Sequence, residues 1–416
     1  MPAAEILFVV CVALILYPYV VYPLLMALVA RLRPRPVRRD VGAGPLLAVS
    51  FIVAAHNEQA RIEGRLRELI GLLEVRGNAD DEILIVTDGS TDDTATLVRQ
   101  YTKHFVRLVE LPNRGGKAAA ISRGAALARN EILVFADTRQ TWAPDALTRL
   151  LENFADPDIG AVSGDLVLTT GNGTMAGVGL YWRFEKWLRR QESAIGSQVG
   201  VTGAISACRR ALFRPIPAGT LLDDVYWPVG VALGGKRVIH DCRAVAYDRL
   251  PEKAGDEFRR KVRTLAGNFQ LVQRRPEVLS PWRNPIWIQM VSHKMARLVV
   301  PWALLGLLVA CILGDGLLYD LALAVQAVTY GLALIGLLTK RGGKLLGSAS
   351  SFLVLNAAAW VAFWVWMTGR AAQSWTKVAY TPRKGTRIRR IERMKTDQTN
   401  SIEVEPSSSV SHSYEL

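Results

Sequence analysis

The chain contains little cysteine and little histidine. Its 416 residues include four cysteines and five histidines, and no two cysteines have the spacing of a zinc site or of a disulfide framework. Two of the cysteines, Cys11 and Cys311, lie inside long apolar runs. The cysteine content therefore excludes a disulfide-linked exported domain and a zinc-ligand protein, and it favours a catalytic domain in a reducing cytosol.

The signatures of several large enzyme classes are also absent from the sequence. There is no H-E-x-x-H metalloprotease motif, no hydrolase nucleophile elbow, no protein-kinase motif set and no dinucleotide fingerprint. The segment N-R-G-G-K at 113–117 is not a Walker A loop, because Leu111 and Ala118 occupy positions where that loop needs Gly and Ser or Thr. These absences exclude the corresponding proteases, hydrolases, kinases and dehydrogenases.

Negative charge is in deficit, since 51 Lys and Arg residues face 37 Asp and Glu residues and leave a net charge of +14. Much of the excess follows two apolar segments, and the basic residues there are Arg31, Arg33, Arg35, Arg38, Arg39, Arg383, Lys384, Arg387, Arg389, Arg390, Arg393 and Lys395. This placement follows the positive-inside rule and suits anionic lipid headgroups better than DNA. Because no ribonucleoprotein aromatic motif is present either, we expect no nucleic-acid partner.

Long apolar runs lie at both ends of the chain. Ile6–Ala30 contains no charged residue, is long enough to cross a bilayer and lacks a clear cleavage site, so we interpret it as a retained anchor. Pro285–Arg297 mixes apolar, aromatic and basic residues, which predicts an interfacial helix. Three apolar spans follow, at 298–313, 321–338 and 345–367.

These runs predict four regions. Residues 1–45 form an anchor with a basic juxtamembrane segment, and 46–280 form a cytosolic catalytic domain. Residues 281–370 carry the interfacial helix and the later spans, and 371–416 form a basic, then Ser-rich and disordered tail. Three full spans after a cytosolic domain would place the C-terminus outside, whereas the basic tail favours the inside. One short span could be re-entrant, and the sequence leaves both topologies open.

The central region alternates between strand and helix patterns. The first half predicts strands at 46–55, 82–87, 106–111 and 131–136, with helices after 57 and at 94–104 and 116–129. The second half predicts strands at 161–169 and 238–247 and helices at 144–154, 181–193, 207–213, 223–233 and 256–273. This alternation predicts an α/β fold with a mostly parallel sheet that binds its ligand at the carboxyl ends of the strands.

Acidic residues follow two of these strands. Asp88 lies in T-D-G-S-T-D-D at 87–93, where a carboxylate can accept hydrogen bonds from a base or ribose. Asp137 lies in F-A-D-T-R-Q at 135–140, where a carboxylate beside a diphosphate can bind Mg²⁺ or Mn²⁺. Each motif alone can equally be a turn with a helix cap.

Three further motifs supply charge. Lys117 ends the glycine-rich segment and can approach a phosphate from a helix start. Asp223 and Asp224 are adjacent carboxylates, and the repulsion between two such charges can make one of them a general base. Arg260 and Arg263 share one helix face and can neutralise a departing diphosphate. The plainer alternatives are a loop-to-helix turn, an acidic helix start and a solvated basic face.

The ordered set A-H-N-E, T-D-G-S, G-G-K, A-D-T-R-Q, L-L-D-D and R-R-K-V-R closely resembles the family 2 inverting glycosyltransferases over about residues 46–375. It is most similar to their membrane-embedded branch of cellulose, hyaluronan, chitin and poly-N-acetylglucosamine synthases. The resemblance implies a Rossmann-like GT-A fold with transmembrane and interfacial helices. It also implies a nucleotide-sugar donor, expected to carry UDP, a saccharide or lipid-linked acceptor, and a multi-pass location in the inner membrane.

The resemblance assigns roles to single residues. Glu58 and Asp88 would contact the uracil and ribose side, and Lys117 would lie near the nucleotide. Asp137 matches the first acid of the D-x-D metal motif, and Asp224, beside Asp223, matches the general base that deprotonates the acceptor. The remaining residues implied to bind the nucleotide sugar are Ala55, Asn57, Gly89, Arg139, Arg260 and Arg263.

Two positions depart from the pattern. Arg139 replaces the second acid of D-x-D, which removes a metal ligand and adds a cation. Thr264 replaces the Trp that is associated with processive synthases. The expected activity is therefore extension of a β-linked exopolysaccharide or oligosaccharide by an inverting displacement, with single-sugar transfer to a lipid-linked acceptor as an alternative. A catalytically dead membrane scaffold or transporter is the alternative from another class.

Overall fold

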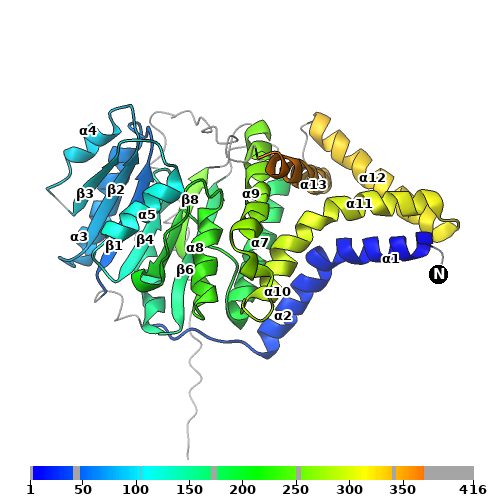
Figure 1. Cartoon of the computed structure of the whole chain (residues 1–416), viewed down its shortest axis with the longest axis horizontal. Coiled ribbons are helices and arrows are strands. Elements are labelled where there is room, and N and C mark those ends of the chain that lie inside the picture. Colours follow the sequence, from blue (N-terminus) through cyan, green and yellow to red (C-terminus); the bar gives the residue numbers. More distant parts are fainter. Residues whose placement is uncertain are drawn as a thin grey trace, which may run out of the picture. The chain divides into compact units, whose positions relative to one another are not determined.

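A computed structural model describes residues 3–40, 47–103, 105–169, 176–249, 254–339 and 343–369. Its central feature is one eight-stranded sheet with the strand order β3-β2-β1-β4-β7-β6-β8-β5 (Figure 1). The strands are β1 Val49–Ala55, β2 Glu82–Asp88, β3 Val106–Leu111, β4 Ile132–Ala136, β5 Thr141–Trp142, β6 Ile159–Thr169, β7 Ile205–Arg209 and β8 Arg237–Arg249. The expected α/β class is confirmed.

The expected parallel arrangement holds for only part of the sheet. The four strands β3, β2, β1 and β4 are parallel neighbours, as the alternating pattern predicts. Strand β7 then pairs antiparallel with both β4 and β6, and β5 pairs antiparallel with β8, so the sheet as a whole is mixed. The carboxyl ends of β1, β2 and β4 still meet at one edge, which is where the motif residues lie.

The prediction of a helix at 207–213 is wrong. Residues Ile205–Arg209 form β7, and only a single 3-10 turn, Arg210–Leu212, follows it. Ile205 and Ala207 pack on one face of the sheet and Cys208 on the other. Because both faces of β7 are buried, its sequence shows no alternation of apolar and polar residues that would mark a strand.

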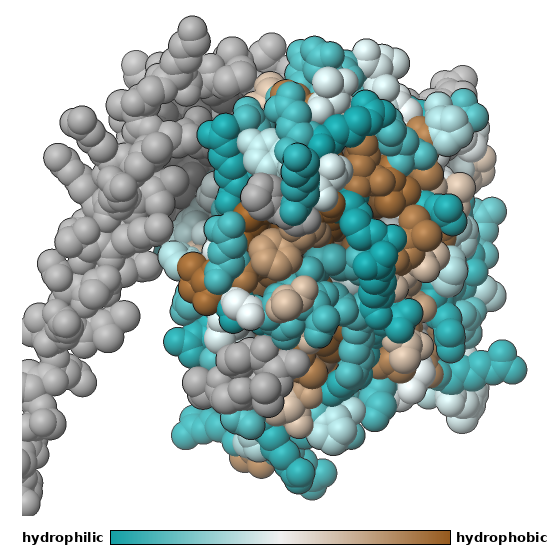
Figure 2. Space-filling model, turned by 90° about the vertical axis from the view of Figure 1, so that its left-hand side faces the viewer, coloured by the Kyte–Doolittle hydropathy of each residue, from teal (hydrophilic) through white to brown (hydrophobic). Residues whose placement is uncertain are grey.

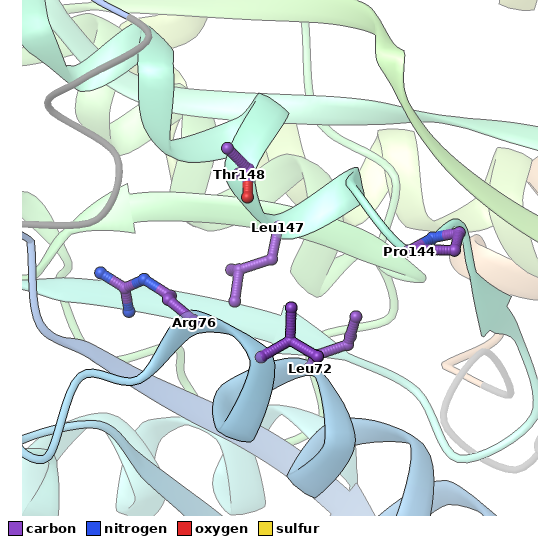
Figure 3. Close-up of a pocket in the computed structure, with 6 residues that line it drawn as sticks. Leu72, Arg76, Pro144, Leu147 and Thr148 are labelled. Atoms are coloured by element: carbon purple, nitrogen blue, oxygen red, sulfur yellow. The ribbon is translucent and has the colours of Figure 1, made fainter.

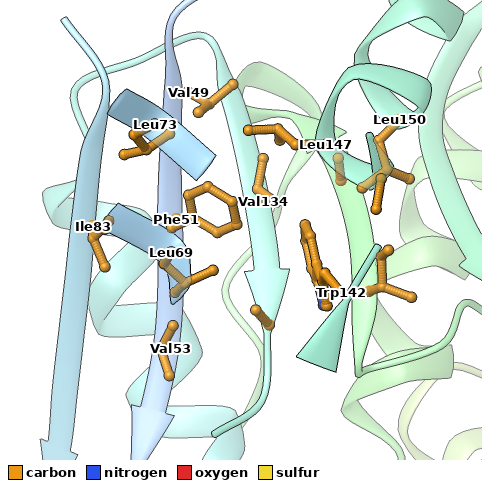
Figure 4. Close-up of a cluster of buried hydrophobic side chains, with 14 of the residues drawn as sticks. Val49, Phe51, Val53, Leu69, Leu73, Ile83, Val134, Trp142, Leu147 and Leu150 are labelled. Carbon is orange, nitrogen blue, oxygen red and sulfur yellow. The ribbon is translucent and has the colours of Figure 1, made fainter. Parts of the chain in front are cut away.

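Helices cover both faces of the sheet. The catalytic-region helices are α3 Ile62–Arg76, α4 Thr94–Arg99, α5 Lys117–Leu127, α6 Ala146–Leu151, α7 Ala176–Ile195, α8 Asp223–Leu233 and α9 Ala254–Arg274, with short turns η3 Glu152–Ala155 and η5 Pro276–Leu279. Side chains of α3 and α6 complete one core layer, in which Phe51 and Trp142 lie 5.5 Å apart between ring centroids (Figure 4). Side chains of α5 and α8 complete the layer on the opposite face. The predicted helix start at Asn57 moves to Ile62, and α4 ends five residues earlier than 104.

In the part of the chain that the structure describes, four long apolar helices are able to cross a membrane by length and composition: Ala3–Leu32, Trp287–Leu313, Leu317–Thr339 and Leu345–Met367. The first joins α1 Ala3–Leu16, η1 Tyr17–Val21 and α2 Tyr22–Leu32. The second joins α10 Trp287–Gln289, η6 Met290–Met295 and α11 Ala296–Leu313, so the expected separate interfacial helix is instead continuous with a span. The last two are α12 Leu317–Thr339 and α13 Lys344–Met367. The expected tail at 371–416 lies outside the described residues.

A buried polar network joins the sheet domain to these apolar helices. The ring of His293 on η6 bonds to two carboxylates of α7, Glu192 through Nδ1 at 2.8 Å and Glu185 through Nε2 at 3.0 Å. The hydroxyl of Tyr22 on α2 donates to Glu192 at 2.6 Å.

The face of the molecule on the left of Figure 1, near β3 and α4, is mostly hydrophilic (Figure 2).

Candidate active site

The motif residues gather where β1, β2 and β4 end and where α5 and α8 begin. These five elements come from separate parts of the sequence, so the acids and the lysine are brought together only by the fold.

A pocket elsewhere, between α3 and α6, contains no motif residue (Figure 3). It is lined by Leu72, Val75, Arg76, Pro144, Leu147 and Thr148. Its one cation is already paired with Asp81 at 2.6 Å.

Asp88 binds the backbone of the glycine-rich loop through its carboxylate. Its buried carboxylate accepts hydrogen bonds from the backbone N–H of Gly115 at 2.6 Å and of Gly116 at 2.8 Å. The sequence placed Asp88 near the base and ribose. In the structure, its oxygens hold the loop that leads into α5, so its immediate effect is to fix the position of Lys117.

Gly89 allows this close approach of two loops. Its φ is +57°, and a Cβ atom there would lie 2.7 Å from the backbone nitrogen of Arg114. A side chain at this position would therefore be strained by its backbone conformation and would also displace the 113–116 segment. Glycine is required here for a structural reason that the motif alone does not show.

The A-H-N-E segment is tied to the loop after β2. The Asn57 side-chain oxygen accepts a hydrogen bond from the N–H of Thr91 at 2.8 Å, and the Glu58 N–H donates to the hydroxyl of Thr94 at 2.8 Å. Asn57 adopts a φ of +51°, which asparagine tolerates better than most residues. The side chain of Ala55 is buried in the core, which leaves only its backbone groups for a ligand.

Lys117 lies between the acids of two motifs. Its Nζ is 2.8 Å from Oδ1 of Asp137 and 3.6 Å from Oδ2 of Asp223. Burial opposes the charge on Lys117, but the carboxylates of Asp137 and Asp223 outweigh it and raise the lysine pKa above its usual range. Lys117 is therefore a fixed cation at physiological pH, at the start of α5.

Asp224 is the second residue of α8, and its side chain is half-buried. Burial, together with the negative charge of Asp223, raises its pKa to about 6, although Lys117 acts in the opposite direction. The carbonyl oxygen of Asp224 accepts a hydrogen bond from the N–H of Val201 at 2.8 Å, which fixes the start of the helix. A carboxylate with a pKa near working pH is suited to accept a proton from a hydroxyl group.

Asp137 is one carboxylate available to a metal ion. Its side chain is 33% exposed, and its oxygens belong to the ligand type that Mg²⁺ and Mn²⁺ prefer. Within the described ranges there is no group of three His, Cys, Asp or Glu residues placed to hold a metal. The residues fit a metal only if a bound diphosphate and water supply the other ligands.

Arg139 points toward β8. Its Nε lies 3.0 Å from Oδ1 of Asp248 and its Nη2 lies 2.5 Å from Oδ2. The sequence placed this cation beside the phosphates and did not identify Asp248. The sequence does contain one signal for this contact, because Asp248 directly follows the predicted strand 238–247. In the structure, that strand pairs with the segment that follows Asp137.

Arg260 and Arg263 lie on α9, which packs against the segment before α8. Gln270 of α9 accepts a hydrogen bond from the N–H of Leu221 at 2.9 Å, and Gly267 lies directly against Leu222. The two arginines lie about one and two turns before Gly267, and the Nε of Arg263 is buried without a hydrogen-bond partner in the described part of the chain. The structure thus places them on the helix that borders Asp223 and Asp224.

Comparison with known proteins gives matches of three kinds. Residues 50–216 match the family model described as glycosyl transferase family 2. The poly-beta-1,6-N-acetyl-D-glucosamine synthase of Staphylococcus aureus strain COL is 24% identical over 277 residues, which cover 64% of this chain and 66% of the relative. The synthase of the same name from Staphylococcus epidermidis is 23% identical over 233 residues, which cover 54% of this chain and 56% of the relative. The chain thus spans 66% and 56% of the lengths of these two relatives.

Among solved structures, a mannosyltransferase from Pyrobaculum calidifontis in complex with GDP-Man and Mn²⁺ superposes with a TM-score of 0.68. The alignment covers 88% of this chain and 99% of the other, at 23% sequence identity. At that identity the likeness establishes the fold. It covers more of the chain than the family-model match over residues 50–216.

Proposed function

We propose that the protein is a membrane-bound inverting glycosyltransferase that uses a nucleotide-sugar donor, because residues 50–216 match the glycosyl transferase family 2 model and the chain has the GT-A fold. It extends a β-linked exopolysaccharide or oligosaccharide at the cytosolic face of the membrane. The observation that carries the proposal is the ion pair of Lys117 with Asp137, beside Asp223 and Asp224, at the carboxyl edge of the sheet.

The donor would bind with its diphosphate between the glycine-rich loop and Asp137. Lys117 supplies a fixed positive charge there, and the resemblance assigns Glu58 and Asp88 to the side of the nucleotide base. We propose UDP as the nucleotide. The structure of the similar mannosyltransferase is a complex with GDP-Man, so a guanine nucleotide is the competing choice that a donor panel must include.

Asp137 would hold a divalent ion, Mg²⁺ or Mn²⁺, together with oxygens of the diphosphate. Such an ion would stabilise the negative charge that develops on the leaving diphosphate. Lys117 acts in the same sense without a metal, since its ammonium group is already placed against Asp137. Arg260 and Arg263 on α9 are the further cations proposed for this role.

Asp224 would take the proton from the acceptor hydroxyl. The acceptor oxygen then attacks the anomeric carbon, the bond to the diphosphate breaks, and the configuration inverts in this single displacement. General-base assistance contributes roughly 10²–10⁴-fold to such a step. Oδ2 of Asp223 lies 3.6 Å from Nζ of Lys117. Asp223 would therefore pair with the lysine, and Asp224 would act as the base.

The membrane helices and the similar synthases support a saccharide product. Four helices among the described residues are able to cross a membrane, and the relatives are named poly-beta-1,6-N-acetyl-D-glucosamine synthases. Single-sugar transfer to a lipid-linked acceptor is the second candidate, because Thr264 stands at the Trp position associated with processivity and its hydroxyl bonds within its own helix to Arg260 at 2.9 Å. A catalytically dead scaffold is the third, and the clustered Lys117, Asp137 and Asp224 argue against it.

The deciding experiment uses the full chain in lipid nanodiscs with radiolabelled UDP-, GDP- and dTDP-sugars. We expect transfer from one UDP-sugar and a ladder or high polymer on product sizing, and we expect Asp224→Asn to lose nearly all turnover. A single lipid-extractable product would select the second candidate. Failure to bind or turn over any sugar nucleotide would contradict the proposal.

A further inference from the structure

We propose that Arg139 and Asp248 form a positioning pair that fixes the segment carrying Asp137, so that Arg139 acts through Asp248 and not on the donor phosphates. The role concerns the proposed transfer reaction and therefore rests on the proposed function. It gives the departure from the D-x-D pattern a physical meaning, and it assigns a function to Asp248, which no motif contains.

The pair has the geometry of a strong ionic contact. Two guanidinium nitrogens of Arg139 face the two oxygens of Asp248, at 3.0 Å and 2.5 Å. Such a bidentate contact fixes orientation as well as distance, and lysine cannot reproduce it. The carboxylate of Asp248 is only 4% exposed, so removal of Arg139 would leave a buried charge without this ionic contact.

The backbone pairing of β5 with β8 leads to the same contact. Thr141 pairs with Tyr247 and Trp142 with Ala246 in antiparallel register, and one further step places Gln140 opposite Asp248. The side-chain nitrogen of Gln140 donates to Asp248 at 2.9 Å. Asp248 is thus bonded by two consecutive side chains of the segment that follows Asp137.

Helix α3 holds the segment from another side. Arg65 donates from Nη1 to the backbone oxygen of Gln140 at 3.1 Å, and Glu68 accepts from the N–H of Trp142 at 2.5 Å. Arg65 and Glu68 are themselves paired at 3.0 Å, and Arg65 is buried. Residues 139–142 are therefore fixed by both α3 and β8.

Asp137 lies between this fixed segment and strand β4, which ends at Ala136. Its backbone can move only if one of the two anchors moves. Placement of a reacting group within a fraction of an ångström has large effects on rate, since a displacement of about 1 Å can lower it about 100-fold. The pair therefore supports the one carboxylate of the motif that faces Lys117.

The test combines Arg139→Gln, Asp248→Asn and the double variant in full-length protein in nanodiscs. Amide hydrogen exchange over 137–142 reports on the segment, and kcat and donor KM report on transfer. We expect about tenfold faster exchange and about tenfold lower kcat in each single variant, a smaller change in KM, and no further loss in the double variant. Arg139→Lys should not restore kcat.

A matched control breaks an ion pair of similar length away from the site. Arg99 and Glu110 lie 2.6 Å apart and both are about half exposed, so Arg99→Gln should leave exchange over 137–142 and kcat unchanged. Wild-type kcat in Asp248→Asn, combined with a loss in Arg139→Gln, would mean that Arg139 acts on the phosphates and would overturn the proposal. Unchanged exchange in both single variants would also overturn it. Exchange decides the pair even if the wild-type protein turns over no nucleotide sugar, a result that would refute only the proposed function.

Discussion

The Nζ atom of Lys117 lies 2.8 Å from Oδ1 of Asp137, although Lys117 begins α5, Asp137 follows the end of β4, and the two residues belong to different motifs. The contact joins the glycine-rich loop to the end of β4. It also places a permanent cation where negative charge would develop on a leaving diphosphate. The proposed chemistry depends on this contact more than on any other single one.

Replacing Lys117 with methionine should therefore remove most of the transfer activity. The methionine side chain keeps much of the length and loses the charge, so we expect kcat to fall roughly 10²–10³-fold, as when one preorganised electrostatic group is removed. Steady-state kinetics with the preferred donor measure the effect. Lys236→Met is the matched control, because Lys236 bonds an exposed backbone oxygen, that of Pro157, at 2.9 Å. Equal kcat values for the two variants would contradict a role of Lys117 in the reaction.

The rate should depend on the ionisation of Asp224. Burial and the charge of Asp223 raise its pKa to about 6, so the carboxylate is largely protonated at pH 5 and ionised at pH 7. A general base works only when ionised, and kcat/KM should therefore rise with pH through about 6 and then level off. The profile is measured over this interval in the wild-type protein and in Asp224→Asn, whose residual rate should lose the inflection.

The same pKa shift predicts the effect of Asp224→Asn on stability. Because the pKa of Asp224 is higher in the folded state than the unperturbed 3.8, the folded protein binds the proton more tightly. The ionised group thus lowers stability as the pH rises from about 4 through 6, and this loss is complete at neutral pH. Asp224→Asn should then unfold at the same temperature as the wild type or higher at pH 7.5. A marked drop in unfolding temperature would indicate a structural role instead.

Gly89→Ala should disturb the glycine-rich loop, because the new methyl group would meet the backbone of that loop and not the acidic side chains of the site. The new methyl group would lie 2.7 Å from the backbone nitrogen of Arg114, and the φ of +57° disfavours any side chain. We expect a loss of about 1–3 kcal/mol in the free energy of unfolding and a raised donor KM. Gly71→Ala in α3 is the control: a Cβ there meets no atom within 4 Å, and helix propensity predicts a gain of up to about 1 kcal/mol. Denaturant unfolding of both variants measures the difference.

The positions of the acids after strands could be predicted from the sequence, because continuous apolar strands with acids directly after them are a local pattern. Asp88 and Asp137 do lie at one edge of the sheet, and the family resemblance and the GT-A fold are confirmed. Hydrogen bonding between distant segments is not a local pattern. The bonds from Gly115 and Gly116 to Asp88, and the partner of Arg139, therefore emerge only in the structure.

The second half of the sheet was harder to predict for a related reason. Strand β7 is buried on both faces, and its residues Ile205–Arg209 carry neither the alternation of a half-exposed strand nor a turn signal. Its antiparallel insertion between β4 and β6 brings Gly203 against Lys117, whose Nζ would lie 3.1 Å from a Cβ at that glycine. Because this strand was assigned to a helix, the sequence did not show which residues line this side of the site. The roles given to single residues remain predictions that the experiments above test.

Metal binding should require the nucleotide. Asp137 is the one motif carboxylate left at the D-x-D position, its Oδ1 already faces Lys117, and a single carboxylate binds Mg²⁺ or Mn²⁺ weakly in water. A ligand that binds only the folded state stabilises it by RT ln(1 + L/Kd), where L is the free ligand concentration, so the unfolding temperature rises with the affinity and the concentration of the ligand. We therefore expect 1 mM Mn²⁺ alone to leave the unfolding temperature unchanged, UDP alone to raise it slightly, and the two together to raise it by more than the sum. Asp137→Asn should abolish the excess, whereas Asp145→Asn, at an exposed acid in the same part of the fold, should keep it. A shift with Mn²⁺ alone that Asp137→Asn removes would mean that the protein supplies further ligands, and the single-carboxylate account of this site would then be wrong.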